Sequence, residues 1–365
     1  MRFFCNIIVR FDATEKGAVR FVNIPRSSNV VDAMHSMSSR SIATLGVVLL
    51  LTVLSSSVSH ATLLREGDEY WVLNSRCISS VACRANLENP NLKVYRYHQG
   101  QGLQHDSVNG LYTRVDEDHS FLNVIYVHGN RFTSQEAIDR SLKIYRSVNR
   151  RCHDQTRIRW ILWSWPSDPI FNPLTDVRTK AQRADTQALY VGWLLQHFPA
   201  PDRLEMIGYS FGGRIVTGAL HTAAGGEMKG RTLSGPPLRG SRIGIHLVAP
   251  ALDRHWLASG SRHGLAAENI GSMNLFYNSR DRVLKLYSMV SKYYNPVALG
   301  FAGLGQLAAR SDHLPIQIRA RDCGGAVGLL HDELKYFEPC CNVAETIATT
   351  LDASDSEVIQ LTAAD

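Results

Sequence analysis

Short apolar runs alternate with longer amphipathic stretches through most of this chain. Strands are predicted where apolar residues run together, and helices where they recur every three or four positions. The predicted strands are 69–76, 91–98, 121–130, 157–168, 203–209, 243–252, 272–279 and 314–322. The predicted helices are 133–151, 179–198, one that starts after residue 210, and a last one near 331–337. Strands that alternate with helices in this way predict an α/β fold, a mainly parallel sheet with helices on both faces.

Local signals place some of the boundaries. Thr133 and Glu136 are spaced for a capping box at the start of a helix. Pro166 ends the strand that precedes it, since proline cannot donate to a strand ladder. A polar insert rich in glycine and proline fills residues 225–242. No internal repeat and no second domain boundary is evident, so residues 62–351 are expected to form one domain, with a polar tail at 352–365.

The first 61 residues follow another pattern. From Met37 a basic residue, Arg40, precedes an apolar segment of 13 residues at 42–54, and small residues stand at Ser59 and Ala61. This arrangement is typical of a signal peptide at about 37–61 that is cleaved near Ala61. The apolar segment is shorter than the about 20 residues that a membrane-spanning helix needs, although an uncleaved anchor is the alternative. We therefore expect an exported protein, with residues 1–36 as an upstream extension.

Composition and charge narrow the class of protein. Hydrophobic residues make up 44% of the chain and charged residues 20%, which is ordinary for a globular domain. The formal net charge is +6, but residues 1–61 hold six of the 39 basic and three of the 33 acidic residues, which leaves +3 for the rest. With no basic run, nucleic-acid binding has no support. No obligate protein partner is evident.

Six cysteines follow the leader: Cys77, Cys83, Cys152, Cys323, Cys340 and Cys341. An even number in an exported protein predicts disulfides, with a connectivity that the sequence leaves open. Zinc binding by the last three and His331 is not favoured, because there is no C-x-x-C pair and the spacing is irregular. No metal and no organic cofactor is therefore expected.

The stretch "IGYSFGG" at 207–213 carries the strongest chemical signal. It places Ser210 in a G-x-S-x-G motif between an apolar strand and a helix. A serine hydroxyl is a weak nucleophile that needs a base, an oxyanion site and a position clear of the backbone. The motif supplies the last of these, because glycines let the helix pack closely behind a sharp turn. Ser210 is the predicted nucleophile.

An oxyanion site needs two backbone amides. One should belong to Phe211, which follows the serine, and the other to a loop after an earlier strand. The "VIYVHGN" strand end supplies His128, Gly129 and Asn130, and Gly129 is expected to turn the chain so that the Asn130 amide faces the substrate. His128 is interpreted as a packed, hydrogen-bonded residue and not as the base.

The acid and base should follow in the order serine, acid, histidine. Asp281 lies just beyond a strand in "YNSRDRVL", while Asp253, beyond the preceding strand, is the alternative. Either aspartate could instead cap a helix. His331 follows the last strand and is the predicted base, whereas His313 precedes that strand and belongs to the opposite edge of the sheet.

The segments "VIYVHGNRFTSQEA", "ILWSWPSD" and "IGYSFGGRIVTGAL" resemble a poorly characterised family of α/β-hydrolase domains, in which a strand end of the HG-x type, a W-P-S segment and a serine elbow occur in this order. The resemblance is clearest over about residues 121–220. It implies the α/β-hydrolase fold and a serine-hydrolase triad, carried here by Ser210, Asp281 and His331. It implies no particular substrate, because the fold hosts many chemistries.

Together these observations predict an exported serine hydrolase that cleaves an ester through an acyl-enzyme, with an amide or thioester as alternatives. The substrate would be a small-molecule or lipid-like acyl compound. Two other functions stay open: acyl transfer to another acceptor, and a non-catalytic scaffold that binds a ligand.

Overall fold

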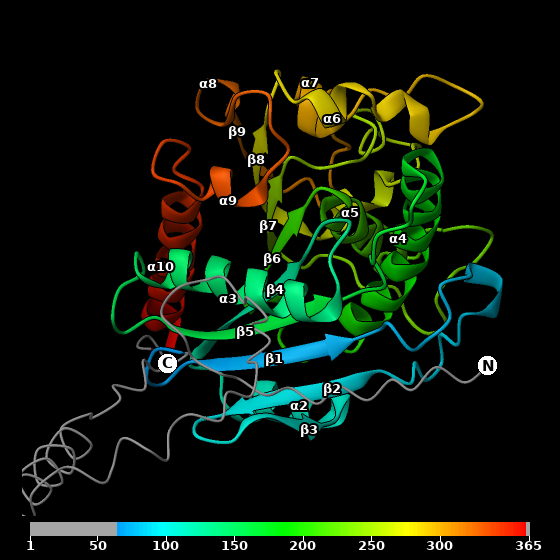
Figure 1. Cartoon of the computed structure of the whole chain (residues 1–365). Helices are drawn as coiled ribbons and strands as arrows, with labels where there is room; N and C mark the ends of the chain where they lie inside the picture. The colour runs from blue at the N-terminus through cyan, green and yellow to red at the C-terminus, as the bar shows by residue number, and fades with distance from the viewer. Residues whose placement is uncertain (1–63, 363–365) are drawn as a thin grey trace, which may run out of the picture. The chain divides into compact units, whose positions relative to one another are not determined.

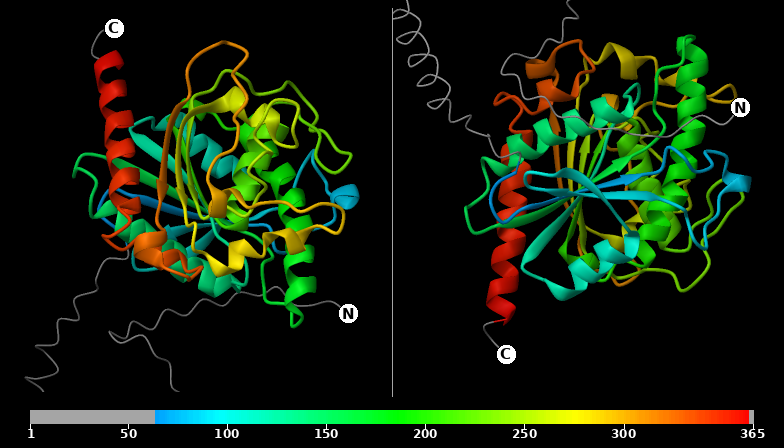
Figure 2. Two further views of the ribbon diagram at one scale, coloured as in Figure 1. Left: turned by 90° about the horizontal axis from the view of Figure 1, so that it is seen from above. Right: turned by 60° about the horizontal axis from the view of Figure 1, so that its bottom comes forward.

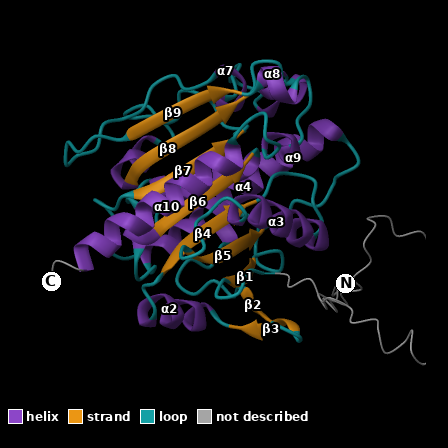
Figure 3. Cartoon of the chain, turned by 90° about the vertical axis from the view of Figure 1, so that its left-hand side faces the viewer, coloured by secondary structure: helices purple, strands orange, loops and turns teal. Residues whose placement is uncertain are grey.

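The structure of the protein, a computed structural model, describes residues 64–362. Its centre is a sheet of nine strands in the order β3-β2-β1-β5-β4-β6-β7-β8-β9, which Figure 3 shows from one side. Neighbouring strands are parallel except where β2 pairs with β1 and with β3. The strand bounds are β1 Glu69–Asn74, β2 Lys93–His98, β3 Gly102–Asp106, β4 Phe121–Val127, β5 Arg157–Ser164, β6 Leu204–Tyr209, β7 Ile243–Val248, β8 Ile270–Tyr277 and β9 Gln317–Asp322.

Helices cover both faces of the sheet, as the alternating pattern predicts (Figures 1 and 2). Helix α3 packs against α10 on one face, and α4 packs along α5 on the other. The four short helices α6, α7, α8 and α9 lie toward one end of the molecule (Figure 1). The helix bounds are α2 Val108–Glu117, α3 Ser134–Asn149, α4 Pro173–Gln196, α5 Phe211–Ala223, α6 Arg282–Lys285, α7 Leu299–Ala302, α8 Gly324–Val327, α9 Glu333–Tyr336 and α10 Val343–Thr362, with the 3-10 helix η5 at Tyr287–Val290.

The central strands are mainly apolar, and both of their faces are covered. Every residue of β4, β6 and β7 is buried, the pattern expected of parallel strands between two helical layers. The edge strand β9, in contrast, is exposed throughout and reads Gln-Ile-Arg-Ala-Arg-Asp. Charged side chains on an exposed edge discourage pairing with another sheet.

The helix signals are confirmed in part. Thr133 and Glu136 form the predicted capping box at the start of α3. Helix α4 begins earlier than predicted, at Pro173, because the Asn172 side chain accepts a hydrogen bond from the Thr175 amide and proline suits the first helical turn. The predicted start at residue 179 was wrong, since Asp176 is the only buried residue among 173–178 and the apolar periodicity there is weak.

Strand β3, helices α2 and α10, and the short helices α6, α7 and α8 were not predicted. Strand β3 and helix α2 lie where the sequence is largely polar. Helix α10 continues to Thr362 and so crosses the residues assigned to a polar tail. Apolar residues in its first half, among them Ile347 and Leu351, are buried. Asp352 accepts hydrogen bonds from the His153 amide and the Thr156 hydroxyl, which ties the helix to the loop before β5.

The expected disulfide framework is not found among five of the six cysteines. Cys83, Cys152, Cys323, Cys340 and Cys341 are free thiols. Burial raises the pKa of the Cys152 thiol to about 12, which makes it an inert packing residue. The predicted signal peptide lies outside the described residues. Within residues 64–362, no helix is both long and apolar enough to cross a membrane.

Candidate active site

Ser210 stands at a sharp turn between β6 and α5. Its backbone has φ 53° and ψ −119°, a conformation that costs energy for a residue with a side chain. The glycines make the turn possible: a Cβ on Gly208 would lie 2.7 Å from Gly213 Cα, and one on Gly212 would lie 2.0 Å from the Val127 carbonyl oxygen. The start of α5 therefore lies against β6 and the end of β4 with no room for side chains at these glycines, and Ser210 is held where β6 ends.

Three of the predicted residues form one hydrogen-bonded chain. Ser210 Oγ lies 2.9 Å from His331 Nε2, and His331 Nδ1 lies 2.6 Å from Asp281 Oδ2. A carboxylate can only accept, so Nδ1 carries the proton and Nε2 is left to accept from the serine. The Asp281 side chain is fully buried and that of His331 is 13% exposed. The imidazole also stacks on Tyr209, with ring centroids 5.1 Å apart.

Asp281 has a second task in the structure. Its other oxygen, Oδ1, accepts hydrogen bonds from the Val283 amide (2.8 Å) and the Leu284 amide (2.9 Å), which caps α6. Helix capping and contact with the histidine were considered as alternatives for this residue, but one carboxylate does both. The cap fixes the rotamer that aims Oδ2 at His331.

Asp253 and His313, the alternatives to Asp281 and His331, make contacts away from Ser210. Asp253 Oδ1 accepts from the His255 amide at 2.9 Å, a local turn contact. His313 is exposed and precedes β9, in a loop where its φ is 59°. Neither is hydrogen-bonded to Ser210 or His331 in the described part of the chain.

The two amides predicted for the oxyanion site both line the cavity at Ser210. Neither the Phe211 amide nor the Asn130 amide donates a hydrogen bond to any residue that the structure describes. The next amide, that of Arg131, is used: it donates to the Ser167 carbonyl at 2.8 Å. Gly129 is needed for another reason than a turn, because a Cβ there would lie 2.6 Å from the Tyr209 ring.

His128 is a packed residue, as predicted. Its ring is fully buried and stacks on Trp165. Nε2 accepts from the Trp165 amide at 3.2 Å, so the proton sits on Nδ1, which donates to the Gly129 carbonyl at 2.8 Å. Burial, helped by the charge of Arg76, lowers the pKa of His128 to about 3. The neutral ring locks the HG-x loop against the W-P-S segment.

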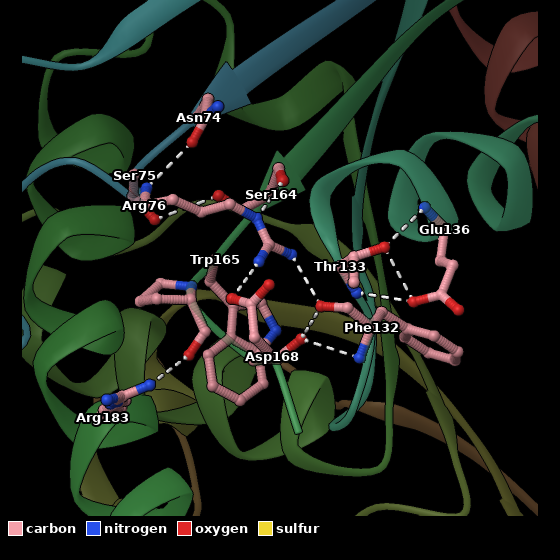
Figure 4. A network of polar contacts seen from close by, with 12 residues as sticks. Asn74, Ser75, Arg76, Phe132, Thr133, Glu136, Ser164, Trp165, Asp168 and Arg183 are labelled. Atoms are coloured by element: carbon pink, nitrogen blue, oxygen red, sulfur yellow. Dashed lines mark hydrogen bonds and ion pairs between the residues drawn. The ribbon is translucent and has the colours of Figure 1, made fainter. Parts of the chain in front are cut away.

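Arg76, which sequence reasoning missed, ties three strand ends together (Figure 4). Its guanidinium donates to Ser164 Oγ (3.0 Å), to Asp168 Oδ2 (2.7 Å) and to the Phe132 carbonyl (3.0 Å). These partners belong to β5, to the loop after it and to the β4–α3 loop. A planar donor group of this kind suits several acceptors at once. The result is a fixed position for the loop that carries Asn130.

A buried ion pair fixes the same loop from the other side. Asp176 Oδ2 accepts from Asn130 Nδ2 at 2.8 Å, and Asp176 Oδ1 lies 2.8 Å from Lys180 Nζ. Both charged side chains are almost wholly buried. The i,i+4 spacing of the pair is visible in the sequence, but such pairs usually lie on exposed helix faces. Nothing in the sequence marked this one as buried beside the site.

A cavity of about 710 Å³ opens around Ser210 and His331. This size is within the range of small-molecule binding sites. Much of its lining is apolar: Phe132, Pro173, Leu174, Val177, Val283, Leu286, Met289 and Val290. The polar part includes Arg131, Arg140, Arg282, Asp332 and Glu333. Among the described residues, no cluster of His, Cys, Asp and Glu could hold a metal ion.

Comparisons with known proteins add structural likeness only. No protein family and no curated protein matches the chain. Solved structures that resemble it include an inhibited esterase B from Lactobacillus rhamnosis, at 12% identity and TM-score 0.38 over 88% of this chain and 99% of that one. A second structure of that esterase matches at 13% identity and TM-score 0.36, over 89% and 98%.

The fold class follows from the chain's own architecture. The sheet is mostly parallel, β4 lies between β5 and β6 in it, and helices cover both of its faces. Ser210 stands on the turn from β6 to α5. An acid and a histidine follow in chain order, after β8 and after β9. These are the features of the α/β-hydrolase fold, and this is the fold of the chain.

Proposed function

We propose that the protein is a serine hydrolase that cleaves an ester through an acyl-enzyme. The observation that carries the proposal is the hydrogen-bonded chain from Ser210 through His331 to Asp281, with distances of 2.9 and 2.6 Å. The arrangement has the geometry that nucleophilic catalysis by serine requires, a base within hydrogen-bond reach and a third group that orients it.

In the proposed reaction, His331 Nε2 takes the proton of Ser210 Oγ as the oxygen attacks the acyl carbon. The Phe211 and Asn130 amides stabilise the oxyanion, and their lack of other partners supports this role. His331 then gives the proton to the departing alkoxide, and Asp281 stabilises the imidazolium. Water repeats the sequence and releases the acid.

The apolar lining of the cavity supports a small-molecule or lipid-like acyl substrate. Amide or thioester cleavage would use the same groups, and acyl transfer would differ only in the final acceptor. A binding scaffold without activity is the alternative of another class. The alignment of Ser210, His331 and Asp281 in one hydrogen-bonded chain argues against a binding scaffold.

The test is the turnover of p-nitrophenyl octanoate by wild type and Ser210→Ala. We expect a loss of roughly 10⁴- to 10⁶-fold, as in proteases that lose the nucleophile, with an unchanged circular dichroism spectrum. Ser234→Ala, an exposed serine of the polar insert, is the matched control and should keep full activity. Retained turnover in purified Ser210→Ala would refute the proposal.

We also propose export, with cleavage near Ala61 and a mature chain that starts at Thr62. The support is the leader pattern alone, a basic residue, a short apolar segment and small residues before the cleavage site. Intact mass of the exported protein tests this directly. An uncleaved chain in the membrane fraction would favour the anchor instead.

A further inference from the structure

The cavity at Ser210 has two unlike walls. One wall is apolar and comes from the start of α4, from η5 and from Leu286, which precedes η5: Pro173, Leu174, Val177, Leu286, Met289 and Val290. The wall toward α3 is polar and carries Arg140, Asp332 and Glu333. A substrate that fills both walls must itself have an apolar part and a polar part.

The guanidinium groups of the arginines in this cavity have N–H donors without close acceptors. Arg140 Nη1 lies 3.4 Å from Asp332, and its Nε lies 3.9 Å from Glu333 Oε2. Both distances exceed the about 2.7–2.9 Å of a well-formed charged hydrogen bond. Arg282 is exposed and makes no side-chain hydrogen bond or ion pair with any residue in the described range.

Arg131 is in a similar position. Its side chain is 53% exposed and lies 3.4 Å from Asp176. That carboxylate already accepts from Lys180 Nζ and Asn130 Nδ2, each at 2.8 Å. The contact of Arg131 with Asp176 is therefore the weakest of the three, and its guanidinium is available to a ligand.

The acidic residues that line the same cavity are Asp176, Asp332 and Glu333. Asp332 is 45% exposed and can turn toward solvent. Glu333 is buried and its Oε2 has no hydrogen-bond partner, while Oε1 accepts from Tyr126 at 2.7 Å. Burial raises the pKa of Glu333 to about 7, so this carboxyl is partly neutral near pH 7. Arg131 and Arg140 thus have only long contacts with acidic side chains, which leaves their guanidiniums, with that of Arg282, able to bind an anion.

The base decides which part of a substrate meets the polar wall. A general acid must lie within hydrogen-bond reach of the leaving oxygen, so the leaving group lies beside His331. Asp332 and Glu333 follow His331 directly in the chain, and Arg140 contacts both. The alcohol part therefore extends along the polar wall, which leaves the apolar wall to the acyl chain.

We propose that the substrate is an ester between an apolar acyl chain and an alcohol that carries an anionic group, a phosphate or a carboxylate, bound by Arg140, Arg131 and Arg282. This inference rests on the proposed function. The bond between acyl carbon and alkoxy oxygen breaks as the bond to Ser210 Oγ forms. The serine proton passes through His331 to the alkoxide, and water then releases the fatty acid, so the charged alcohol leaves unchanged.

The experiment compares three esters with the same chain: the octanoyl esters of glycerol, of glycerol 3-phosphate and of glycerate. We expect kcat/KM to be about tenfold higher for the anionic esters than for the neutral one, in line with the strength of a charged hydrogen bond. A preference for one anion identifies phosphate or carboxylate as the natural group. Equal kcat/KM for all three esters would overturn the inference.

Variants locate the effect. Arg282→Gln should remove much of the advantage of the anionic esters, and Arg282→Lys should restore part of it. Lys285→Gln removes an exposed charge from the same helix outside the cavity lining and should leave the ratio unchanged. If Arg282→Gln, Arg131→Gln and Arg140→Gln all keep the wild-type ratio, the assignment of the arginines is wrong.

Binding separates this inference from the proposed function. Calorimetry with Ser210→Ala measures affinity for octanoylglycerol 3-phosphate and octanoylglycerol without turnover. Tighter binding of the phosphate ester, without hydrolysis by the wild type, would support the anion site and refute the hydrolase. Hydrolysis of the three esters at equal rates and with equal affinities would refute the anion site and keep the hydrolase.

Discussion

Two regions beside Ser210 are built in opposite ways. The polar frame, which consists of the β4–α3 loop at 128–133 with Arg76, Asp168 and Asp176, holds the backbone beside Ser210. The apolar segment, residues 283–290, forms part of the cavity wall. Asp281 joins this segment to the hydrogen-bonded chain at Ser210, since Oδ2 meets His331 and Oδ1 caps the helix that starts the segment.

The loop of the polar frame is held by several independent hydrogen bonds. Its loop is bonded through the Phe132 carbonyl to Arg76, through the Arg131 amide to Ser167, and through the Asn130 side chain to Asp176. Each of these contacts joins the loop to a different strand end or helix. Oxyanion donors must be held within about 0.5 Å of their productive position, and the redundancy of the frame meets that demand.

The apolar segment is held at few points. Tyr287 is buried and accepts from Arg214 at 3.2 Å, and the Met289 carbonyl accepts from Arg178 at 3.1 Å. Before Tyr287 in the chain, Val283 and Leu286 are 55% and 59% exposed. An acyl chain needs only an apolar surface, without directed bonds. The contrast teaches that the chemical groups are fixed by polar networks while the substrate wall is left adaptable.

The largest effect should come from Asp281, which contacts His331 and caps α6. We expect Asp281→Asn to lower kcat by roughly 10⁴-fold, because a wrongly oriented histidine costs about that much in the serine protease that serves as the template. Asp253→Asn, whose residue contacts only a local amide, should lose less than tenfold. Steady-state kinetics with a nitrophenyl ester decide between the two. A larger loss at Asp253 would move the acid to the loop after β7.

The next effect concerns the polar frame. Asp176→Asn leaves the Lys180 ammonium buried without its carboxylate, which should lower the free energy of unfolding by about 3–5 kcal/mol. The control is Glu338→Gln, which breaks an equally short pair with Lys335 on the surface and should cost less than about 1 kcal/mol. Urea unfolding of both variants measures the difference. Equal losses of unfolding free energy in the two variants would show that burial of the Asp176–Lys180 pair has no effect on stability.

Glu333 makes a pH-dependent contribution at the polar wall. Its folded-state pKa of about 7 lies above the ordinary value of 4.5, so the folded protein keeps this proton longer than the unfolded chain. Stability from this group is present below pH 4.5 and is lost as pH rises to about 7, by up to about 3 kcal/mol.

The groups that face Glu333 are Tyr126, Arg140 and Asp332. Glu333→Gln keeps an acceptor for Tyr126 but cannot titrate. The difference between the urea unfolding midpoints at pH 5 and pH 7.5 should therefore be smaller in the variant than in the wild type. The same pH dependence in both proteins would contradict this origin.

The smallest effect belongs to the apolar segment. Leu286→Ser should raise KM for an octanoyl ester a few-fold, because it removes part of the apolar wall, and stability should change by less than about 0.5 kcal/mol. Val81→Ser is the matched control, since Val81 is also about half exposed (51%) and lies outside the cavity lining. Chain-length profiles of kcat/KM compare the two. An unchanged profile in Leu286→Ser would mean that the acyl chain takes another path.

The sequence predicted the features that depend on local patterns of residues. The eight strands β1, β2 and β4 to β9 and the start of α3 follow from the sequence pattern and a capping box, and the elbow motif places Ser210 on its turn. Position relative to the predicted strands was enough to choose Asp281 over Asp253 and His331 over His313 for the hydrogen-bonded chain. Their catalytic roles stay predictions.

What the sequence did not indicate depends on partners far apart in the chain. Arg76 meets Asp168 and Phe132 only after β1, β5 and β4 align. Glu333 becomes a buried acid because Tyr126 of β4 lies beside it. Helix α2 is a largely polar segment of which only Leu111 and Val115 are buried. Periodicity cannot report contacts of this kind.

The most direct test of the central claim is covalent labelling by a fluorophosphonate probe. Reaction requires an activated serine, so the account predicts one equivalent of label per chain, located by peptide mass spectrometry on Ser210, and a strong slowing of labelling in Asp281→Asn and His331→Ala. No labelling of the folded wild type, or labelling at a serine other than Ser210, would contradict the account.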